Sequence, residues 1–148
     1  MKLAIGCDEA GFYLKEEVKK HLSEMGHEIE DVGVYNTDPA MYPDVAAAVA
    51  GKIINKEVTR GILICGTGIG MAMTANKFHG IRAAVCHDSF STERSIKSNN
   101  AHIMCMGARV IGSELAKQLV GMWVSYEYID GPSTPKIDRM MHYDAKRD

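Results

Sequence analysis

Short apolar runs alternate with amphipathic segments along the chain. The runs are nearly continuous, which is typical of strands buried on both faces of a sheet. Between them apolar residues recur at helical spacing, as at Leu14, Val18 and Leu22. The pattern predicts strands at residues 3–7, 28–34, 61–65, 81–86 and 103–107, and helices covering residues 14–25, 43–53, 71–77, 89–98, 115–126 and a last segment from 134.

Strands that alternate with helices build βαβ units, and such units place a parallel sheet between helical layers. We therefore expect an α/β fold, a three-layer sandwich with a five-stranded parallel sheet and helices on both faces. No linker, repeat or low-complexity tract divides the 148 residues. The length suits one domain with its own core, so a single domain over 1–148 is predicted.

Composition narrows the classes of function. A formal net charge of -2 gives no global attraction to nucleic acid or to a membrane surface. No apolar run is long enough to span a bilayer, and the first residues are unlike a signal peptide, so a cytoplasmic location is expected. The four cysteines form no C-x-x-C pair, so no metal site is predicted; Cys86 and Cys105 fit small buried hydrophobic positions.

One glycine-rich loop follows the apolar run that ends at Cys65, and good helix formers follow the loop. Strand, glycine loop and helix form a ligand site at the carboxyl end of a parallel strand. Its glycines allow close approach of the backbone, and free N–H groups at a helix start favour negative charge. The loop lacks the Gly-Lys-Ser/Thr ending of a P-loop and the G-x-G-x-x-G spacing, so support for nucleotide binding is weak.

Carboxyl ends of parallel strands lie along one edge of a sheet, so polar residues there converge. Position alone favours neither catalysis nor helix capping for Asp8. Thr67 suits either a hydroxyl donor or a turn, and His87 with Asp88 is better interpreted as a helix start. For Arg109, the ordinary alternative to a role in the site is an ion pair with an acidic side chain on the surface.

Several motifs together resemble one enzyme family over nearly the whole chain. They are Gly6-Cys7-Asp8-Glu9-Ala10-Gly11-Phe12, Tyr42-Pro43-Asp44, Ile64-Cys65-Gly66-Thr67-Gly68-Ile69-Gly70, Ala75-Asn76-Lys77, Gly80-Ile81-Arg82-Ala83 and Gly107-Ala108-Arg109-Val110. They resemble ribose-5-phosphate isomerase B and the related galactose-6-phosphate isomerase subunits, most specifically through the cysteine-glycine-threonine loop. The resemblance implies a Rossmann-like homodimer, in some relatives a tetramer, that interconverts an aldose phosphate and a ketose phosphate through a cis-enediolate without a metal or another cofactor.

The chemistry assigns roles to these residues. Cys65 is suited to be the general base if the helix start favours its thiolate. The substrate-binding loop (Gly66, Thr67, Gly68, Ile69 and Gly70) can stabilise the enediolate with its N–H groups and the Thr67 hydroxyl, as an oxyanion hole does. Tyr42 and Asp8 are expected to hold the sugar ring oxygen and hydroxyls. The resemblance implies that Asn99 and Arg109 come from the partner subunit, with Arg109 and Lys136 on the phosphate.

The chain departs from the family pattern at four positions. Glu9 stands where the family usually has a phosphate-binding histidine, and Ser98 where it has the histidine that opens the ring. Pro132 and Lys136 replace arginines, and lysine lacks the bidentate fork. We therefore assign ring opening to Asp8, with Tyr42 or a water held by Ser98.

The sequence thus predicts an isomerase of ribose 5-phosphate and ribulose 5-phosphate. The alternatives are isomerisation of a six-carbon sugar, phosphorylated or free (galactose 6-phosphate or allose type), and a non-catalytic module that binds a nucleotide or sugar phosphate. The thiol favours the enzyme, since a loop that only binds has no need of a base.

Overall fold

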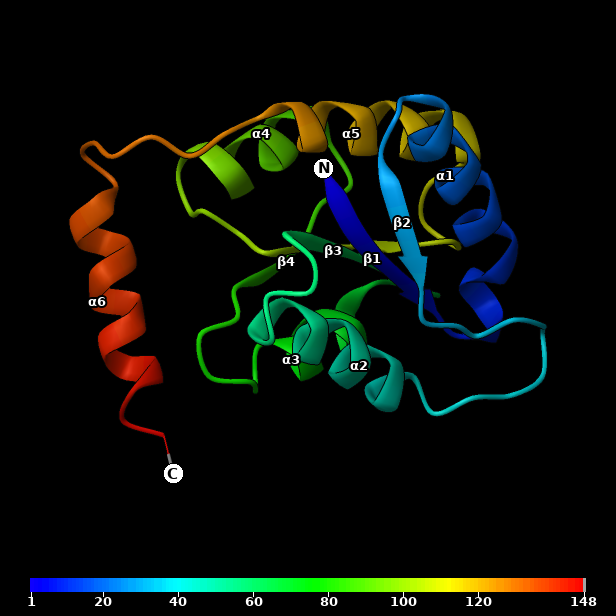
Figure 1. Ribbon diagram of the computed structural model, residues 1–148, viewed down its shortest axis with the longest axis horizontal. Coiled ribbons are helices and arrows are strands. Elements are labelled where there is room, and N and C mark those ends of the chain that lie inside the picture. The colour runs from blue at the N-terminus through cyan, green and yellow to red at the C-terminus, as the bar shows by residue number, and fades with distance from the viewer. Residues whose placement is uncertain (148) are drawn as a thin grey trace.

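A five-stranded sheet forms the centre of the molecule (Figure 1). The computed structural model describes residues 1–147. All pairs are parallel, in the order β2-β1-β3-β5-β4. The strands are β1 (Lys2–Cys7), β2 (Glu28–Asp31), β3 (Arg60–Cys65), β4 (Ala83–Val85) and β5 (Ile103–Gly107). The predicted parallel α/β sheet is confirmed.

Helices cover both faces of the sheet (Figure 1). On one face lie α1 (Phe12–Glu24), α4 (Ser89–Lys97) and α5 (Ser113–Ser125), and on the other α2 (Tyr42–Ile54) and α3 (Ile69–Ala75). Alternate strand residues supply the two cores: Ile62 packs towards α1 and α5, whereas Leu63 packs towards α2 and α3. The short 3₁₀ helix η1 (Glu9–Gly11) links β1 to α1.

The last helix, α6 (Thr134–Asp144), stands apart from the two layers (Figure 1). It is attached near the start of β4, where Arg82 Nη1 lies 3.4 Å from Met141 Sδ and the Gly80 N–H donates to Asp144. Only Ile137 of this helix is buried among the described residues. None of the helices within residues 1–147 combines the length and apolar character needed to cross a membrane.

Two strands are shorter than the apolar pattern predicts. β2 ends at Asp31 rather than at residue 34, because the Asp31 carboxylate accepts the Gly33 N–H and Gly33 turns the chain with φ +100°. β4 begins at Ala83 rather than at residue 81, because the Ile81 N–H is used in a turn to Phe78. Apolar runs therefore overestimate strand length where a turn takes their first or last N–H groups.

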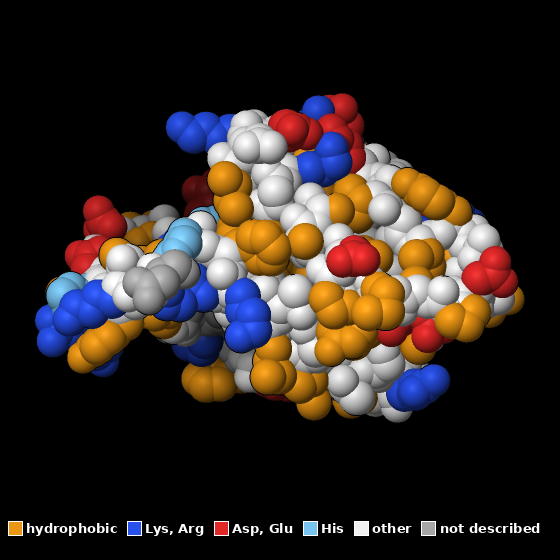
Figure 2. All heavy atoms as spheres, turned by 90° about the horizontal axis from the view of Figure 1, so that it is seen from below, with side chains coloured by type: hydrophobic (Ala, Val, Ile, Leu, Met, Phe, Trp, Pro, Cys, Tyr) orange, Lys and Arg blue, Asp and Glu red, His pale blue; other side chains and the backbone are white. Residues whose placement is uncertain are grey.

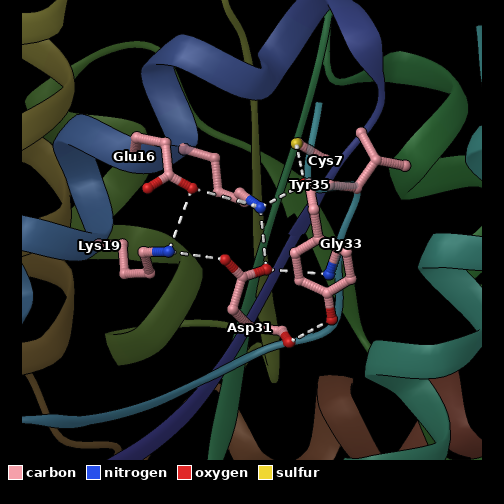
Figure 3. Close-up of polar contacts among 8 residues, drawn as sticks. Cys7, Glu16, Lys19, Asp31, Gly33 and Tyr35 are labelled. Atoms are coloured by element: carbon pink, nitrogen blue, oxygen red, sulfur yellow. Dashed lines mark hydrogen bonds and ion pairs between the residues drawn. The ribbon is translucent and has the colours of Figure 1, made fainter. Parts of the chain in front are cut away.

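A buried charge cluster holds the chain segment after β2 (Figure 3). Lys15 is fully buried on α1, and its ammonium donates to Asp31 Oδ1 at 2.9 Å and to the Val34 carbonyl. Figure 3 shows Asp31 between Lys19 and Gly33, so this carboxylate joins α1 to the turn. The cluster fixes the start of the loop that leads to α2 and Tyr42. Burial raises the pKa of the nearby Cys7 thiol to about 11, which keeps it protonated at neutral pH.

His102 predicts a pH dependence of stability. Burial first, and then Arg82 and Arg60, lower its pKa to about 4, while its Nδ1 accepts the Arg82 N–H. The unfolded chain takes up this proton near the ordinary pKa of about 6.5, so stability falls as the pH drops from there towards 4. His102→Asn keeps an acceptor without titrating. Denaturant titrations should show that the wild type loses more unfolding free energy between pH 7 and pH 5, by on the order of 1 kcal/mol; equal losses would contradict this assignment.

Candidate active site

The cysteine-glycine-threonine loop folds back onto the cysteine itself. Cys65 is the last residue of β3 and is only 6% exposed, and its Sγ accepts the Gly68 N–H at 3.0 Å. A donor aimed at sulfur stabilises negative charge on it. Gly68 has φ +81°, and a Cβ there would lie 2.9 Å from the Met106 backbone, so only glycine allows this approach. α3 has only seven residues, and the group at its start that contacts the Cys65 sulfur is the Gly68 amide.

Thr67 combines the two roles that its position suggests. Its Oγ1 accepts the Ile69 N–H at 3.2 Å, so the hydroxyl stabilises the turn that leads into α3. A hydroxyl that accepts one bond still has its own proton to donate. Thr67 and Ile69 are both exposed, which leaves that hydroxyl at the mouth of the loop.

Asp8 lies beside the end of β3. The Asp8 N–H donates to the Ile64 carbonyl, and Gly11 packs so closely that a Cβ would lie 2.5 Å from the same oxygen. Asp8 Oδ1 accepts the Ala10 and Gly11 N–H groups, so the predicted cap is present; among residues 1–147 no hydrogen bond uses Oδ2. Burial raises the Asp8 pKa, and the carboxylate of Glu9 acts in the same direction, against the two backbone bonds and Arg109.

Tyr42 and Arg109 complete the wall around the loop. A Cβ on Gly70 would lie 2.6 Å from the Tyr42 hydroxyl oxygen, so the tyrosine ring rests on the loop backbone. A Cβ on Gly66 would lie 3.4 Å from Arg109 Nη1, which places this guanidinium beside the loop of its own chain. The resemblance assigned Arg109 to the partner's site, whereas in this structure it stands at its own. The structure thus brings together Asp8, Tyr42, Arg109 and the loop from Cys65 to Gly70.

Three other predicted site residues lie elsewhere in the same chain. Ser98 and Asn99 follow α4, which runs back from the carboxyl end of β4 to the amino end of the sheet. There Arg82, just before β4, donates to the Asn99 carbonyl, and Arg94 donates to Ser98 Oγ. Lys136 lies on α6, which is attached beside the same end of β4. A single chain thus separates these residues from Cys65, in line with the partner origin that the resemblance implied for Asn99, whereas Ser98 was expected to hold a water beside Asp8.

Glu9 has a structural contact that the sequence did not suggest. Its carboxylate accepts the Ala40 N–H at 3.1 Å and so ties the loop before α2 to η1. This bond, together with the Lys15 cluster, holds the segment that ends in Tyr42. Glu9 carries the same sign of charge as a phosphate, so its contact with the chain is the role that the geometry supports.

His87 stands at the same sheet edge, directly before the N-cap residue of α4, as the sequence predicted. Asp88 does cap α4 by accepting the Ser91 N–H, but the His87 ring itself accepts the Gly107 N–H at 2.8 Å. Burial lowers the His87 pKa, against the influence of Asp88. Its position directly after a strand was the available signal, since that place puts a side chain on the edge that carries Cys65.

Comparison with known proteins places this arrangement in a family. A model of the ribose/galactose isomerases matches residues 3–140. The chain belongs to the ribose/galactose isomerase family. Ribose-5-P isomerase B of Listeria innocua is 51% identical over 146 residues, which cover 99% of each chain. D-erythrulose-4-phosphate isomerase of Pectobacterium atrosepticum is 45% identical, over 97% of this chain and 95% of that protein.

Solved structures of ribose/galactose isomerases share the fold. The ribose-5-phosphate isomerase B of Clostridium thermocellum superposes with a TM-score of 0.96 at 38% sequence identity, and 99% of each chain is covered. The two-layer helical packing around a parallel sheet is therefore that of the family. The chain is a sugar-phosphate isomerase by family, and because its relatives are named for different substrates, the sugar has to be inferred from the site.

Proposed function

We propose that this protein interconverts ribose 5-phosphate and ribulose 5-phosphate, with Cys65 as the general base. The observation that carries the proposal is the Gly68 N–H directed at Cys65 Sγ, inside a ring of polar groups at the carboxyl end of the sheet. The Listeria innocua relative of that name, 51% identical, supports this substrate. Isomerisation needs a base that removes a proton from C2 of the aldose and returns it to C1, and a positioned base typically contributes ~10²–10⁴-fold.

Negative charge then develops on O1 and O2 of the enediolate. The Thr67 hydroxyl and the loop amides near it are the groups of this chain that can donate to those oxygens. Asp8 lies beside the end of β3 and the Tyr42 hydroxyl lies against Gly70, and in the proposed reaction these two groups hold sugar hydroxyls and move a proton to or from the ring oxygen. Because burial raises the Asp8 pKa, its carboxyl group is better suited to proton transfer than an ordinary surface aspartate.

A substrate panel tests this function against the alternatives. The purified protein is incubated with ribose 5-phosphate, galactose 6-phosphate and free allose, and ketose formation is followed by NMR. The proposal expects ribose 5-phosphate to react faster than either six-carbon sugar. Binding of nucleotides or sugar phosphates without turnover of any sugar would instead identify a non-catalytic module.

We also propose a homodimer in which Ser98, Asn99 and Lys136 serve the partner's site. A single chain holds these residues away from Cys65, and Asn99 and Lys136 are exposed. Figure 2 shows hydrophobic side chains spread over the face that α2 and α3 form. Ile69 and Met73 of α3 are both exposed. An apolar surface beside the loop suits a second copy that supplies the missing groups.

Subunit mixing should reveal the shared site. Cys65→Ala and Asn99→Ala proteins are each expected to be nearly inactive. In a mixed dimer, one site combines an intact Cys65 with an intact partner Asn99, so a one-to-one mixture with free exchange should recover about a quarter of wild-type activity. Mass spectrometry would confirm the mixed dimers. Mixed dimers without recovered activity would contradict the shared site.

A second candidate substrate is a four-carbon sugar phosphate. Ser98 is a poor proton donor near neutral pH, and its hydroxyl already accepts from Arg94, so the chain is weakly equipped to open a furanose. Erythrose 4-phosphate needs no such help, because its O4 carries the phosphate and cannot close a ring. The Pectobacterium atrosepticum relative carries the name of a D-erythrulose-4-phosphate isomerase.

The two candidate substrates can be distinguished by comparing turnover in the two directions of the reaction. If the four-carbon sugar phosphate is the substrate, the saturating aldose-to-ketose turnover of erythrose 4-phosphate should exceed that of ribose 5-phosphate by at least ~10-fold, since a positioned acid–base pair typically supplies ~10²–10⁴-fold. The ribose 5-phosphate proposal expects no such advantage. Ribulose 5-phosphate is already open, so the advantage should shrink when erythrulose 4-phosphate and ribulose 5-phosphate are compared in the reverse direction. An advantage of equal size in both directions would show that ring opening does not distinguish them.

A further inference from the structure

The His87 imidazole takes the place of a strand carbonyl at the edge of the sheet. The last backbone bond between β4 and β5 runs from the Cys86 N–H to the Cys105 carbonyl. β4 then gives way to α4, whose cap is Asp88, so no carbonyl of that strand continues the ladder to the Gly107 N–H. His87 Nε2 accepts that N–H at 2.8 Å instead. A buried N–H without a partner destabilises the fold, so this bond matters to the position of Gly107.

The Cys65–Thr67 loop packs directly on the main chain of Gly107. A Cβ on Gly107 would lie 2.6 Å from Thr67 Cα and 2.7 Å from the Gly66 carbonyl oxygen, so the two backbones are in direct contact. Two further bonds join them, from the Ala108 N–H to the Cys65 carbonyl and from the Arg109 N–H to the Gly66 carbonyl. Any displacement of Gly107 is therefore passed to the loop that carries the thiol and the hydroxyl.

We propose that His87 is a positioning residue of the isomerase site, which holds Gly107 and through it the Cys65–Thr67 loop only while its ring is neutral. The inference rests on the proposed function. In the neutral ring the proton is on Nδ1 and Nε2 is the acceptor. A second proton, on Nε2, would turn this acceptor into a donor that faces the Gly107 N–H. The hydrogen bond to Gly107 is then lost, and the Cys65–Thr67 loop is held less firmly.

The surroundings of His87 agree with a neutral ring at pH 7. Burial lowers its pKa. Within the described residues Asp88 is the one charged group that acts on the ring, and its carboxylate is itself bonded to the Ser91 N–H. β5 faces the ring with the Gly107 main chain rather than with a charge. Activity that depends on the neutral ring should therefore decline at a pH below the ordinary histidine pKa of about 6.5.

Three variants test the proposal. His87→Gln places an amide oxygen near the position of Nε2 without a group that titrates, whereas His87→Leu has no acceptor. His27→Gln removes an imidazole next to Met1, at the opposite end of the sheet. We expect His87→Leu to lower kcat at pH 7.5 by ~10–100-fold with a smaller change in KM, because small misplacements of catalytic groups are costly. We expect His87→Gln to recover most of that loss and to lose the acidic decline of kcat, which His27→Gln should keep.

Two results would overturn the proposal. One is a His87→Leu protein with the kcat and pH profile of the wild type; the other is a His87→Gln protein as impaired as His87→Leu, which would show that the imidazole acts on the substrate. If His87→Leu does not fold, ¹⁵N NMR of the wild-type histidines still decides, since the proposal requires the Nδ1–H form of His87 at pH 7.5 and an Nε2–H form would contradict it. A wild type without turnover would refute the isomerase function and leave this NMR test standing.

Discussion

Cys65→Ala should lower turnover of ribose 5-phosphate by at least ~100-fold while the protein stays folded, since positioned proton transfer typically contributes ~10²–10⁴-fold. The other thiols cannot replace it: Cys105 is fully buried in the core, and burial raises the pKa of both Cys86 and Cys7. The Cys65 side chain is itself nearly buried, so alanine removes the base with little change of the surface.

Cys65→Ser is the matched control for the base. Serine keeps the size of the side chain and an acceptor for the Gly68 N–H, but a hydroxyl is far less acidic than a thiol. Circular dichroism and a thermal melt should show both variants folded. Turnover of either variant above about a hundredth of the wild-type value would remove Cys65 from the role of base.

Gly107→Ala should be nearly as damaging, although Gly107 touches no substrate. A methyl group there would lie 2.6 Å from Thr67 Cα, and the atoms in its way are backbone rather than flexible side chain. The loop must move, and a shift of about 1 Å at a catalytic group can cost 10²-fold in rate. We expect a loss of this size in kcat together with ~1–3 kcal/mol of stability, as in other overpacked sites.

Gly51→Ala is the control for a glycine with free space. Gly51 lies within α2, and no atom stands within 4 Å of a Cβ built there. Alanine in a helix interior stabilises by roughly 0.5–1 kcal/mol relative to glycine, so this variant should melt slightly higher with unchanged kcat. Full activity in Gly107→Ala would show that the close contact between Gly107 and the Cys65–Thr67 loop does not set the geometry of the loop.

The sequence predicted the fold and the core of the site for physical reasons that can be named. Helical spacing and short apolar runs have few solutions other than a covered parallel sheet, so strand number and layers followed from the pattern. Parallel strands place their carboxyl ends on one edge, which is why Asp8 and Cys65 were expected to be close. The glycine-rich loop identified a tight turn after Cys65, and the structure adds that Gly68 in this turn directs its N–H at the thiol.

Other parts of the site could not be predicted, because they depend on packing between distant segments. The path of α4 to the opposite end of the sheet follows from the βαβ pattern, but the contacts that Ser98 and Asn99 make there do not. The bond from the Gly107 N–H to His87 replaces a bond of the β4–β5 ladder, and no local pattern indicates that this ladder bond is missing. The contact between Glu9 and Ala40 likewise joins residues that are 31 positions apart.

Exchange with heavy water tests the central claim most directly. The protein is incubated with ribose 5-phosphate in deuterium oxide until aldose and ketose reach equilibrium, and the C1 and C2 protons are followed by NMR. The account predicts that wild-type protein replaces the C2 proton of ribose 5-phosphate and one C1 proton of ribulose 5-phosphate with deuterium, and that Cys65→Ala does so at least ~100-fold more slowly. Interconversion in which C2 keeps its original hydrogen after many turnovers, or exchange that is as fast in Cys65→Ala, would contradict it.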